Sequence, residues 1–263
     1  MTLTVPPARR RIAVCADDFG LTAAACRSIL SLGAAGAITA TSCAVDGPAL
    51  SAHLPALKAL RPAISVGLHL NLTENPAFAG SQSLPRWILA TWLRHRLDAT
   101  ALRAEIRRQL ERFETLFGTP PDFVDGHEHV HQFPVLRTLL LDELRDRPGA
   151  RMGLRCTWPN HLRGSKAALI GLLGAAATRR EAAARGLRIN RDFAGVYDLK
   201  APSGYATRME EWLRTLDDGG LIMCHPEWPG ETAHLARAHE HVFYSSGDWP
   251  RLLRSWNVAL ARP

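Results

Sequence analysis

The chain has 263 residues, 46% of them hydrophobic, which is enough for one large α/β barrel or two small domains with a sizeable core. The 32 Lys and Arg outnumber the 25 Asp and Glu, giving a formal charge of +7, but the arginines are spread along predicted helices and form no nucleic-acid motif. No apolar run approaches the ~18 residues of a membrane-spanning helix. We therefore expect neither a nucleic-acid partner nor a membrane span.

The cysteines are odd in number, scattered and without a CxxC pair. They are Cys15, Cys26, Cys43, Cys156 and Cys224. This pattern is typical of reduced thiols and predicts a cytoplasmic protein. The N-terminus shows no apolar segment of a signal peptide, and residues 1–10 are expected to be a flexible leader.

Apolar strand-like runs alternate with amphipathic runs along the whole chain. Strands are predicted at 11–16, 37–45, 64–70, from 123, and at 151–156 and 221–224. Helices are predicted at 23–35, 49–60, 85–97, 100–117, 134–147, 165–186, 206–217 and 248–260. The alternation predicts an α/β fold with a mostly parallel sheet, either open or closed as a barrel. Because no boundary or repeat is visible, 1–263 is predicted to be a single domain.

Ionisable side chains stand at the C-terminal ends of the predicted strands. Asp17 and Asp18 follow the first strand, His69 ends the third, and His127 and His225 follow two later ones. Active sites of parallel α/β proteins collect at this edge, so residues far apart in the chain are expected to converge there.

Each of these residues also has an ordinary structural explanation. An aspartate can cap the following helix, and a histidine in an apolar strand can be a hydrogen-bonded core residue. Together, one carboxylate and two imidazoles form a common set of ligands for a catalytic zinc. A second acid beside the metal-bound water can take its proton, which is the arrangement of metal-assisted hydrolysis.

Four motifs carry a resemblance to a known family. They are Ala16-Asp17-Asp18-Phe19-Gly20-Leu21, the GLHLNLT segment at 67–73, the DGHEHVH segment at 125–131 and Met223-Cys224-His225-Pro226. In this order they resemble the YdjC-like carbohydrate deacetylases, which are relatives of the chitooligosaccharide deacetylases. The resemblance implies an irregular (β/α) barrel of mostly parallel strands, related to the barrels of polysaccharide deacetylases.

The resemblance also implies roles for the residues at the strand ends. Asp18, His69 and His127 are expected to bind one divalent metal ion, Zn²⁺ or Mg²⁺, with Mn²⁺ and Co²⁺ as alternatives. Asp17 is expected to be the general base. His225 is the candidate general acid, by analogy with other polysaccharide deacetylases.

Four further residues are predicted substrate contacts: Arg155, Asn71, His131 and Trp158. Arg155 is expected to orient Asp17 or a sugar hydroxyl, although an ordinary surface arginine explains it equally well. His131 could instead support the metal ligands from behind, and Trp158 could pack in the core rather than on a sugar.

The predicted function is removal of an N-acetyl group from an amino sugar in an oligosaccharide, glycolipid or related glycoconjugate. Two alternatives remain: another metal-dependent amidase or esterase on the same barrel, and a sugar- or metal-binding protein without activity. An apolar run within 167–180 is too short to span a bilayer. It could make peripheral lipid contact, form a buried helix or contact a second subunit, so a homo-oligomer stays open.

Overall fold

The computed structural model describes residues 9–93, 97–147, 152–199, 204–232 and 234–263. The strands are β1 (Arg10–Phe19), β2 (Ala40–Cys43), β3 (Ser65–Leu70), β4 (Phe123–Gly126), β5 (Gly153–Leu154), β6 (Arg188–Ile189), β7 (Phe193–Ala194), β8 (Gly220–Cys224) and β9 (Val258–Leu260). The first helices are α1 (Ala23–Ala34), α2 (Leu50–Leu60), α3 (Leu84–Trp92), α4 (Ala99–Phe117), η1 (His127–Gln132) and α5 (Leu136–Arg145). The later ones are α6 (Ser165–Ile170), η2 (Gly171–Ala175), α7 (Ala176–Ala184), α8 (Tyr205–Thr215), α9 (Leu235–Ser245) and α10 (Asp248–Ser255).

The strands form one parallel sheet in the order β6-β5-β4-β3-β2-β1-β8-β7, and β9 also pairs with β1. The two edge strands, β6 and β7, are consecutive in the chain. The linker from Ile189 to Phe193 can span at most about 14 Å, so the sheet must curl until its edges approach each other. Asn190 in this linker binds the backbone of Cys156 next to β5. The predicted irregular barrel of parallel strands is confirmed.

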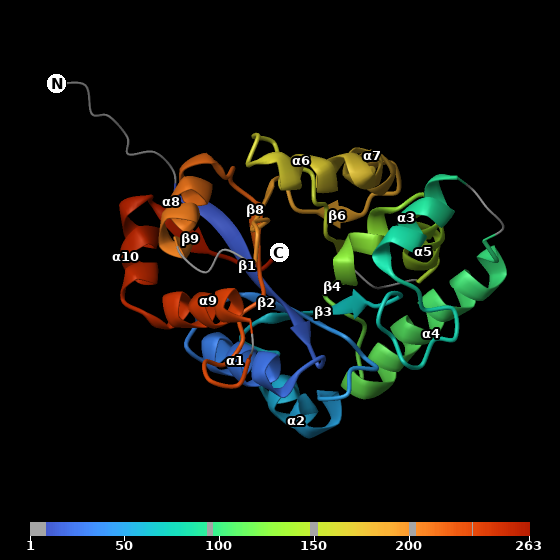
Figure 1. Ribbon diagram of the computed structural model, residues 1–263, viewed down its shortest axis with the longest axis horizontal. Helices are drawn as coiled ribbons and strands as arrows, with labels where there is room; N and C mark the ends of the chain where they lie inside the picture. The colour runs from blue at the N-terminus through green and yellow to red at the C-terminus, as the bar shows by residue number, and fades with distance from the viewer. Residues whose placement is uncertain (1–8, 94–96, 148–151, 200–203, 233) are drawn as a thin grey trace.

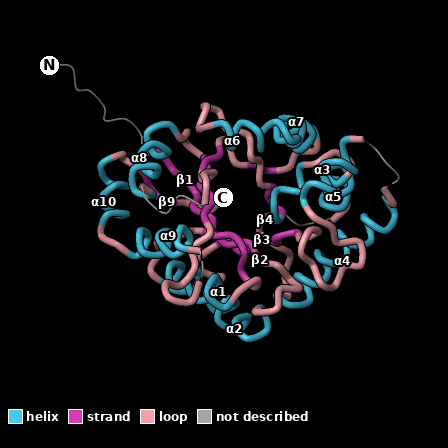
Figure 2. Tube along the Cα trace, viewed as in Figure 1, coloured by secondary structure: helices cyan, strands magenta, loops and turns pink. Residues whose placement is uncertain are grey.

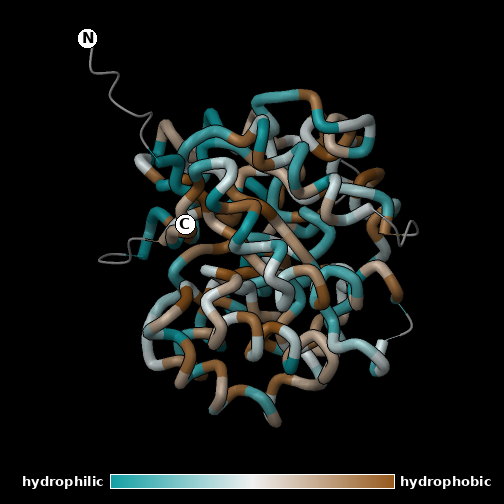
Figure 3. Tube along the Cα trace, turned by 90° about the vertical axis from the view of Figure 1, so that its left-hand side faces the viewer, coloured by the Kyte–Doolittle hydropathy of each residue, from teal (hydrophilic) through white to brown (hydrophobic). Residues whose placement is uncertain are grey.

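Helices surround the strands on the outside of the curled sheet (Figures 1 and 2). Helices α8, α9 and α10 pack together on one side, and α4, α5 and α7 on the other. Hydrophobic and hydrophilic residues alternate in short stretches along the chain, as expected for helices with one face on a sheet (Figure 3). No helix among the described residues has the length and apolar character needed to cross a bilayer.

Helix α4 shows how the sequence sets one of these elements. The Asp98 side chain accepts a hydrogen bond from the backbone N–H of Ala101 and caps the first turn. Gly118 ends the helix in the left-handed conformation, with φ of 73°. The apolar side chains in between recur every three to four residues, and they are buried at Leu102, Ile106, Leu110 and Phe113.

Five elements differ from the sequence-based expectation: β1, η1, η2, α9 and β9. Strand β1 is longer than 11–16 and runs through the acidic pair to Phe19. The histidines after β4 lie on the 3₁₀ helix η1, not on a strand. The stretch 165–186 is broken by the π-helical turn η2, where Gly174 has φ of 124°. The chain also forms α9 and β9, which were not predicted. Strand β9 has only three residues, and the buried face of α9 includes alanines, Glu240 and His241 where large apolar residues would be expected. Residues 1–8 of the predicted leader lie outside the described residues, and Arg10 belongs to β1.

Candidate functional site

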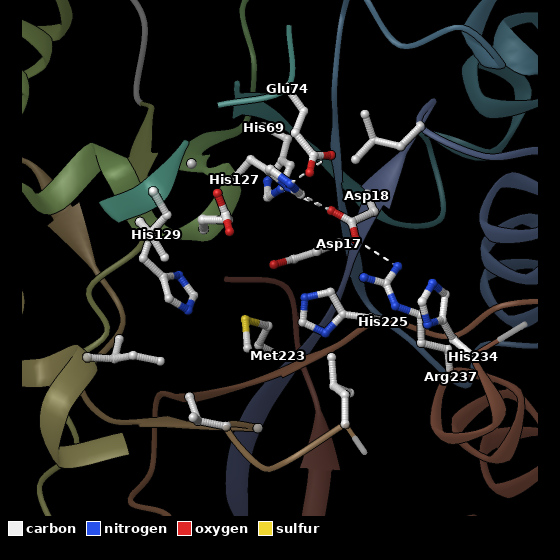
Figure 4. A pocket seen from close by; sticks show the side chains of 18 of the residues that line it. Asp17, Asp18, His69, Glu74, His127, His129, Met223, His225, His234 and Arg237 are labelled. Carbon is white, nitrogen blue, oxygen red and sulfur yellow. Dashed lines mark hydrogen bonds and ion pairs between the residues drawn. The ribbon is translucent and has the colours of Figure 1, made fainter. Parts of the chain in front are cut away.

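The acidic pair lies at an irregularity of β1. The register with β2 is regular up to Ala16 and shifts before Phe19, and Asp18 has φ of 70°. Successive side chains of a regular strand point to opposite faces, but both Asp17 and Asp18 line one cavity of about 930 Å³ (Figure 4). The bulge therefore turns two neighbouring carboxylates toward the same space.

Three predicted residues meet at the top of this cavity. Asp18 Oδ1 lies 3.3 Å from His69 Nε2 and 3.1 Å from His127 Nδ1, and the two nitrogens are 3.2 Å apart. A tetrahedral ion with bonds of about 2.1 Å keeps its ligand atoms about 3.4 Å apart. The three donor atoms thus have the chemistry and the spacing that a divalent cation needs, with the cavity side open to further ligands.

The charges around the two imidazoles also favour a cation. Burial by itself would lower the pKa of His69, but the carboxylates of Asp125, Asp18 and Asp17 together outweigh it and raise the pKa to about 10. In the same way, hydrogen bonds to Asp18 and Glu74 overcome the effect of burial at His127 and raise its pKa to about 9. The surrounding carboxylates therefore stabilise a positive charge at the two histidines. Without a metal ion, the protonated imidazole rings carry that charge.

Asp125 orients His69. The two residues are paired in register on β3 and β4, and Asp125 Oδ1 accepts the Nδ1–H of the ring at 2.6 Å. This hydrogen bond leaves Nε2 facing Asp18 and His127. A carboxylate behind a ligating histidine is a common support of metal sites. The sequence contained a signal for it, since Asp125 ends a strand two residues before His127.

Arg155 holds the other acid of the pair. Its guanidinium donates to both carboxylate oxygens of Asp17, at 2.5 and 2.6 Å. Burial alone would raise the pKa of Asp17, but the charge and hydrogen bonds of Arg155, together with the nearby histidines, outweigh it and place the pKa well below its usual range. Asp17 is therefore an ionised carboxylate, and it contacts the cavity beside Asp18.

His225 follows β8 and lines the same cavity next to Asp17 (Figure 4). Its backbone N–H donates to Glu240 at 2.5 Å, and Glu240 also accepts from the Tyr197 hydroxyl at 2.6 Å. Burial lowers the pKa of His225, so the ring is neutral at pH 7. Its Nδ1 is buried and has no hydrogen-bond partner among the described residues, which leaves it available to a bound molecule.

Arg237 and Glu227 complete the site from the C-terminal part of the chain. Arg237 donates to Asp18 Oδ2 at 3.0 Å and to Glu227 Oε1 at 3.1 Å. Asp18 consequently turns Oδ1 toward the histidines. Arg237 and Glu240 lie on α9, a helix that was not predicted, so neither residue was expected at the site.

Two other groups of acids, cysteines and histidines could bind metal on spacing alone. The group of Cys15, Asp17 and Asp125 encloses the Arg155 guanidinium, so a positive charge already lies there. The second group includes Asp192, whose carboxylate is already paired with Arg163. The chemistry of the donors therefore favours the site at Asp18.

The four predicted substrate contacts are absent from the described residues that line the cavity. Arg155 is 1% exposed and supports Asp17, the first of the two roles expected for it. Asn71 accepts from the backbone N–H groups of Thr73 and Glu74 and shapes the turn after β3.

His131 and Trp158 make contacts outside the described cavity lining. The Nε2 atom of His131 is bonded to the backbone carbonyl of Arg155, so this buried ring holds the Arg155 segment. Burial lowers the pKa of His131 to about 4, so the ring is neutral. Trp158 is half-buried close to Gly171 at the start of η2.

The comparison with solved structures identifies the fold. A protein of Enterococcus faecalis V583, named for cleavage of cellobiose phosphate, superposes with a TM-score of 0.71 at 18% identity, covering 97% of this chain and 98% of the other. A peptidoglycan N-acetylglucosamine deacetylase superposes with a TM-score of 0.50 at 13% identity, covering 98% and 87%. The chain therefore has the barrel fold of these two proteins.

Sequence comparison identifies the family. The chain is 36% identical over 124 residues to a chitooligosaccharide deacetylase of Proteus mirabilis (strain HI4320). This match covers 45% of the chain and 49% of the relative, so the chain spans about half the length of the curated relatives that it matches. The family model described as YdjC-like protein matches residues 11–255. The chain belongs to the YdjC-like protein family.

Proposed function

We propose that this protein removes the acetyl group from an N-acetylated amino sugar with the help of one divalent cation. The observation that carries the proposal is the triangle of Asp18 Oδ1, His69 Nε2 and His127 Nδ1 beside the ionised Asp17. The name of the Proteus mirabilis relative supports the reaction and the class of substrate.

The cation would be held by Asp18, His69 and His127, and its chemistry is to polarise a water molecule and the acetamide carbonyl. Zn²⁺ fits the mixed nitrogen and oxygen donors best. Mg²⁺, Mn²⁺ and Co²⁺ are the alternatives.

Asp17 and His225 move the protons in this proposal. Asp17 takes a proton from the water whose oxygen bonds to the acetyl carbon. The C–N bond then breaks, and His225 protonates the departing nitrogen, so acetate and a free amine are formed. Because the resting His225 ring is neutral, it must acquire this proton during the cycle. Asp17, which lies beside it in the cavity, is the source (Figure 4).

Acetate release tests the proposal directly. The purified protein is treated with a chelator, reloaded with Zn²⁺, Mg²⁺, Mn²⁺ or Co²⁺, and assayed on N-acetylated oligosaccharides, glycolipids and nucleotide sugars. An O-acetylated sugar and a simple N-acetyl amide in the same panel detect the alternative esterase or amidase activity. A panel with no acetate release under any metal would contradict the proposal.

Matched variants assign the roles. We expect Asp17→Asn to bind metal normally and to lose about 10²- to 10⁴-fold in kcat, and His69→Ala to lose metal by elemental analysis. Glu143→Gln is the control, since its carboxylate binds Arg103 and Arg107 away from the cavity. Near-normal turnover by Asp17→Asn would show that Asp17 is not the general base.

A further inference from the structure

The cavity of the candidate site has a polar wall and an aliphatic wall. The polar wall holds the acids and histidines described above. The aliphatic wall comes from α3, α6, η2 and the segment after β7. Its members are Leu84, Ile88, Leu169, Ile170, Leu173, Val196 and Leu199. The proposed reaction uses only the polar wall. The aliphatic wall therefore has no role in the proton transfers or in cation binding.

The aliphatic wall continues onto the surface. Leu169 and Leu172, three residues apart at the junction of α6 and η2, are 58% and 70% exposed. On α3, Leu89 and Trp92 are 58% and 48% exposed. Both helices contribute to the same cavity. Large apolar side chains that are exposed on elements lining one cavity favour a surface that is covered by a ligand.

The aliphatic wall is fixed relative to the cation site. The Gln132 side chain at the end of η1 donates to the backbone carbonyl of Ile170 at 2.9 Å. Gly174 of η2 packs directly on the Gln132 backbone. Since η1 begins at His127, the aliphatic wall and the cation site are joined through one short segment of the chain.

The chemistry of this wall suits a hydrocarbon better than a second sugar ring. A sugar presents hydroxyl groups around its edge that need hydrogen-bond partners when they are buried, and its faces commonly stack on aromatic side chains. The wall residues named above are all aliphatic. Phe133 and Tyr197, two aromatic residues that contact the cavity, are 1% and 9% exposed and offer little ring surface.

We propose that the site takes an N-acetylated amino sugar joined to a hydrocarbon aglycone. The acetamido group lies at the polar wall, and the hydrocarbon lies along Ile88, Leu169 and Leu173 and leaves the cavity between α3 and α6. This inference rests on the proposed function and names its substrate class. The aglycone takes no part in the reaction. One water molecule is still consumed, and acetate and a free amine are still formed.

Alkyl glycosides of N-acetylglucosamine test the inference. Methyl and octyl glycosides are compared below the micelle concentration of the octyl compound, with acetate release as the readout. Each buried methylene contributes about fourfold in affinity, so burial of part of the chain predicts an octyl-to-methyl ratio of kcat/KM above about tenfold, mainly through KM. An equal kcat/KM for the two glycosides, or a preference for tri-N-acetylchitotriose over octyl glycoside, would overturn it.

Matched variants locate the effect. We expect Leu169→Ser and Ile88→Ser to reduce the octyl-to-methyl ratio toward unity. Leu162→Ser is the control, because Leu162 is 84% exposed and outside the described cavity lining, and it should keep the wild-type ratio. A ratio unchanged in Leu169→Ser and Ile88→Ser would also overturn the inference.

Binding separates this inference from the proposed reaction. If no glycoside releases acetate, the proposed reaction fails, and calorimetry with the same two glycosides still tests the aliphatic wall. Tighter binding of the octyl than of the methyl glycoside, lost in Leu169→Ser, supports the wall as a hydrocarbon site. Equal or absent binding of both contradicts it.

Discussion

Arg155 joins Asp17 to Asp125 through one buried guanidinium. It lies 2.5 Å from Asp17 Oδ2 and 2.7 Å from Asp125 Oδ2, and its side chain has no exposed surface. The same Asp125 orients His69 at 2.6 Å. The proposed base and the support of a proposed metal ligand are therefore held by a single cation, so a change at Arg155 affects both.

Replacing Arg155 with lysine is expected to shift the pH dependence of the reaction. Lysine keeps the charge but loses the paired hydrogen bonds to Asp17, so the pKa of Asp17 rises from its depressed position. Because the proposed base works only when it is ionised, a higher pKa of Asp17 moves the acidic limb of the kcat/KM profile to higher pH. We expect a loss of about 10- to 100-fold at neutral pH, and a pH–rate profile checks both effects. An acidic limb that stays at the wild-type pH would contradict the assignment of Asp17.

Metal binding is expected to release protons. With pKa values of about 10 for His69 and 9 for His127, both rings are protonated at pH 7.5 in the metal-free protein. Each must give up the proton on its ligating nitrogen. Calorimetric titration with Zn²⁺ in buffers of different ionisation enthalpy should show about two protons released per ion, with affinity increasing as pH rises toward 9. Binding without proton release would place the ion elsewhere.

The buried pair of Asp192 and Arg163 is expected to control acid stability. Burial alone would raise the pKa of Asp192, but hydrogen bonds from Arg163 and from backbone N–H groups lower it. A depressed pKa stabilises the fold above the unfolded value of about 3.8, and this contribution is lost as pH falls through the folded pKa. Asp192→Asn should cost about 3 to 5 kcal/mol in the free energy of unfolding at pH 7.

Urea unfolding at pH 7 and at pH 3 checks this prediction. The difference between wild type and Asp192→Asn should be smaller at pH 3, because this pH lies below the unfolded-state pKa of about 3.8. The unfolded wild-type chain therefore takes up a proton there more readily than the folded protein does. Asp248→Asn is the control, since it breaks the exposed pair with Arg251 and should change little at either pH. An equal difference at both pH values would show that the charge of Asp192 is not responsible.

Gly174 is expected to be required for the contact between η2 and η1. Its φ of 124° disfavours any side chain, and an added Cβ would collide with the carbonyl oxygen of Gln132. Gly174→Ala should destabilise the fold by about 2 to 4 kcal/mol. Gly186→Ala is the matched control, because Gly186 also has a positive φ, of 69°, but faces open space. Thermal unfolding of the two variants should show the larger loss at Gly174.

The strand-end motifs led to the centre of the candidate site from the sequence alone. Asp17, Asp18, His69, His127 and His225 were expected to converge, and the structure places all five on one cavity. This was predictable because parallel strands present their C-terminal ends at a common edge. The substrate contacts were less predictable, since whether a polar side chain reaches a cavity depends on its neighbours. Arg155, for example, donates hydrogen bonds to the Asp17 carboxylate and is not among the described residues that line the cavity.

The sequence by itself determined the alternation of strands and helices, the position of the ionisable residues at strand ends and the resemblance to one family. These features follow from local apolar periodicity and from short motifs. Only the tertiary structure decided which residues support the centre. Arg237 approaches Asp18 from 219 residues away in the chain, on the helix α9. Likewise, the part of the aliphatic wall on η2 is placed by Gly174, which lets η2 pack against the Gln132 backbone of η1. Such contacts depend on the packing of distant segments, which local sequence does not encode.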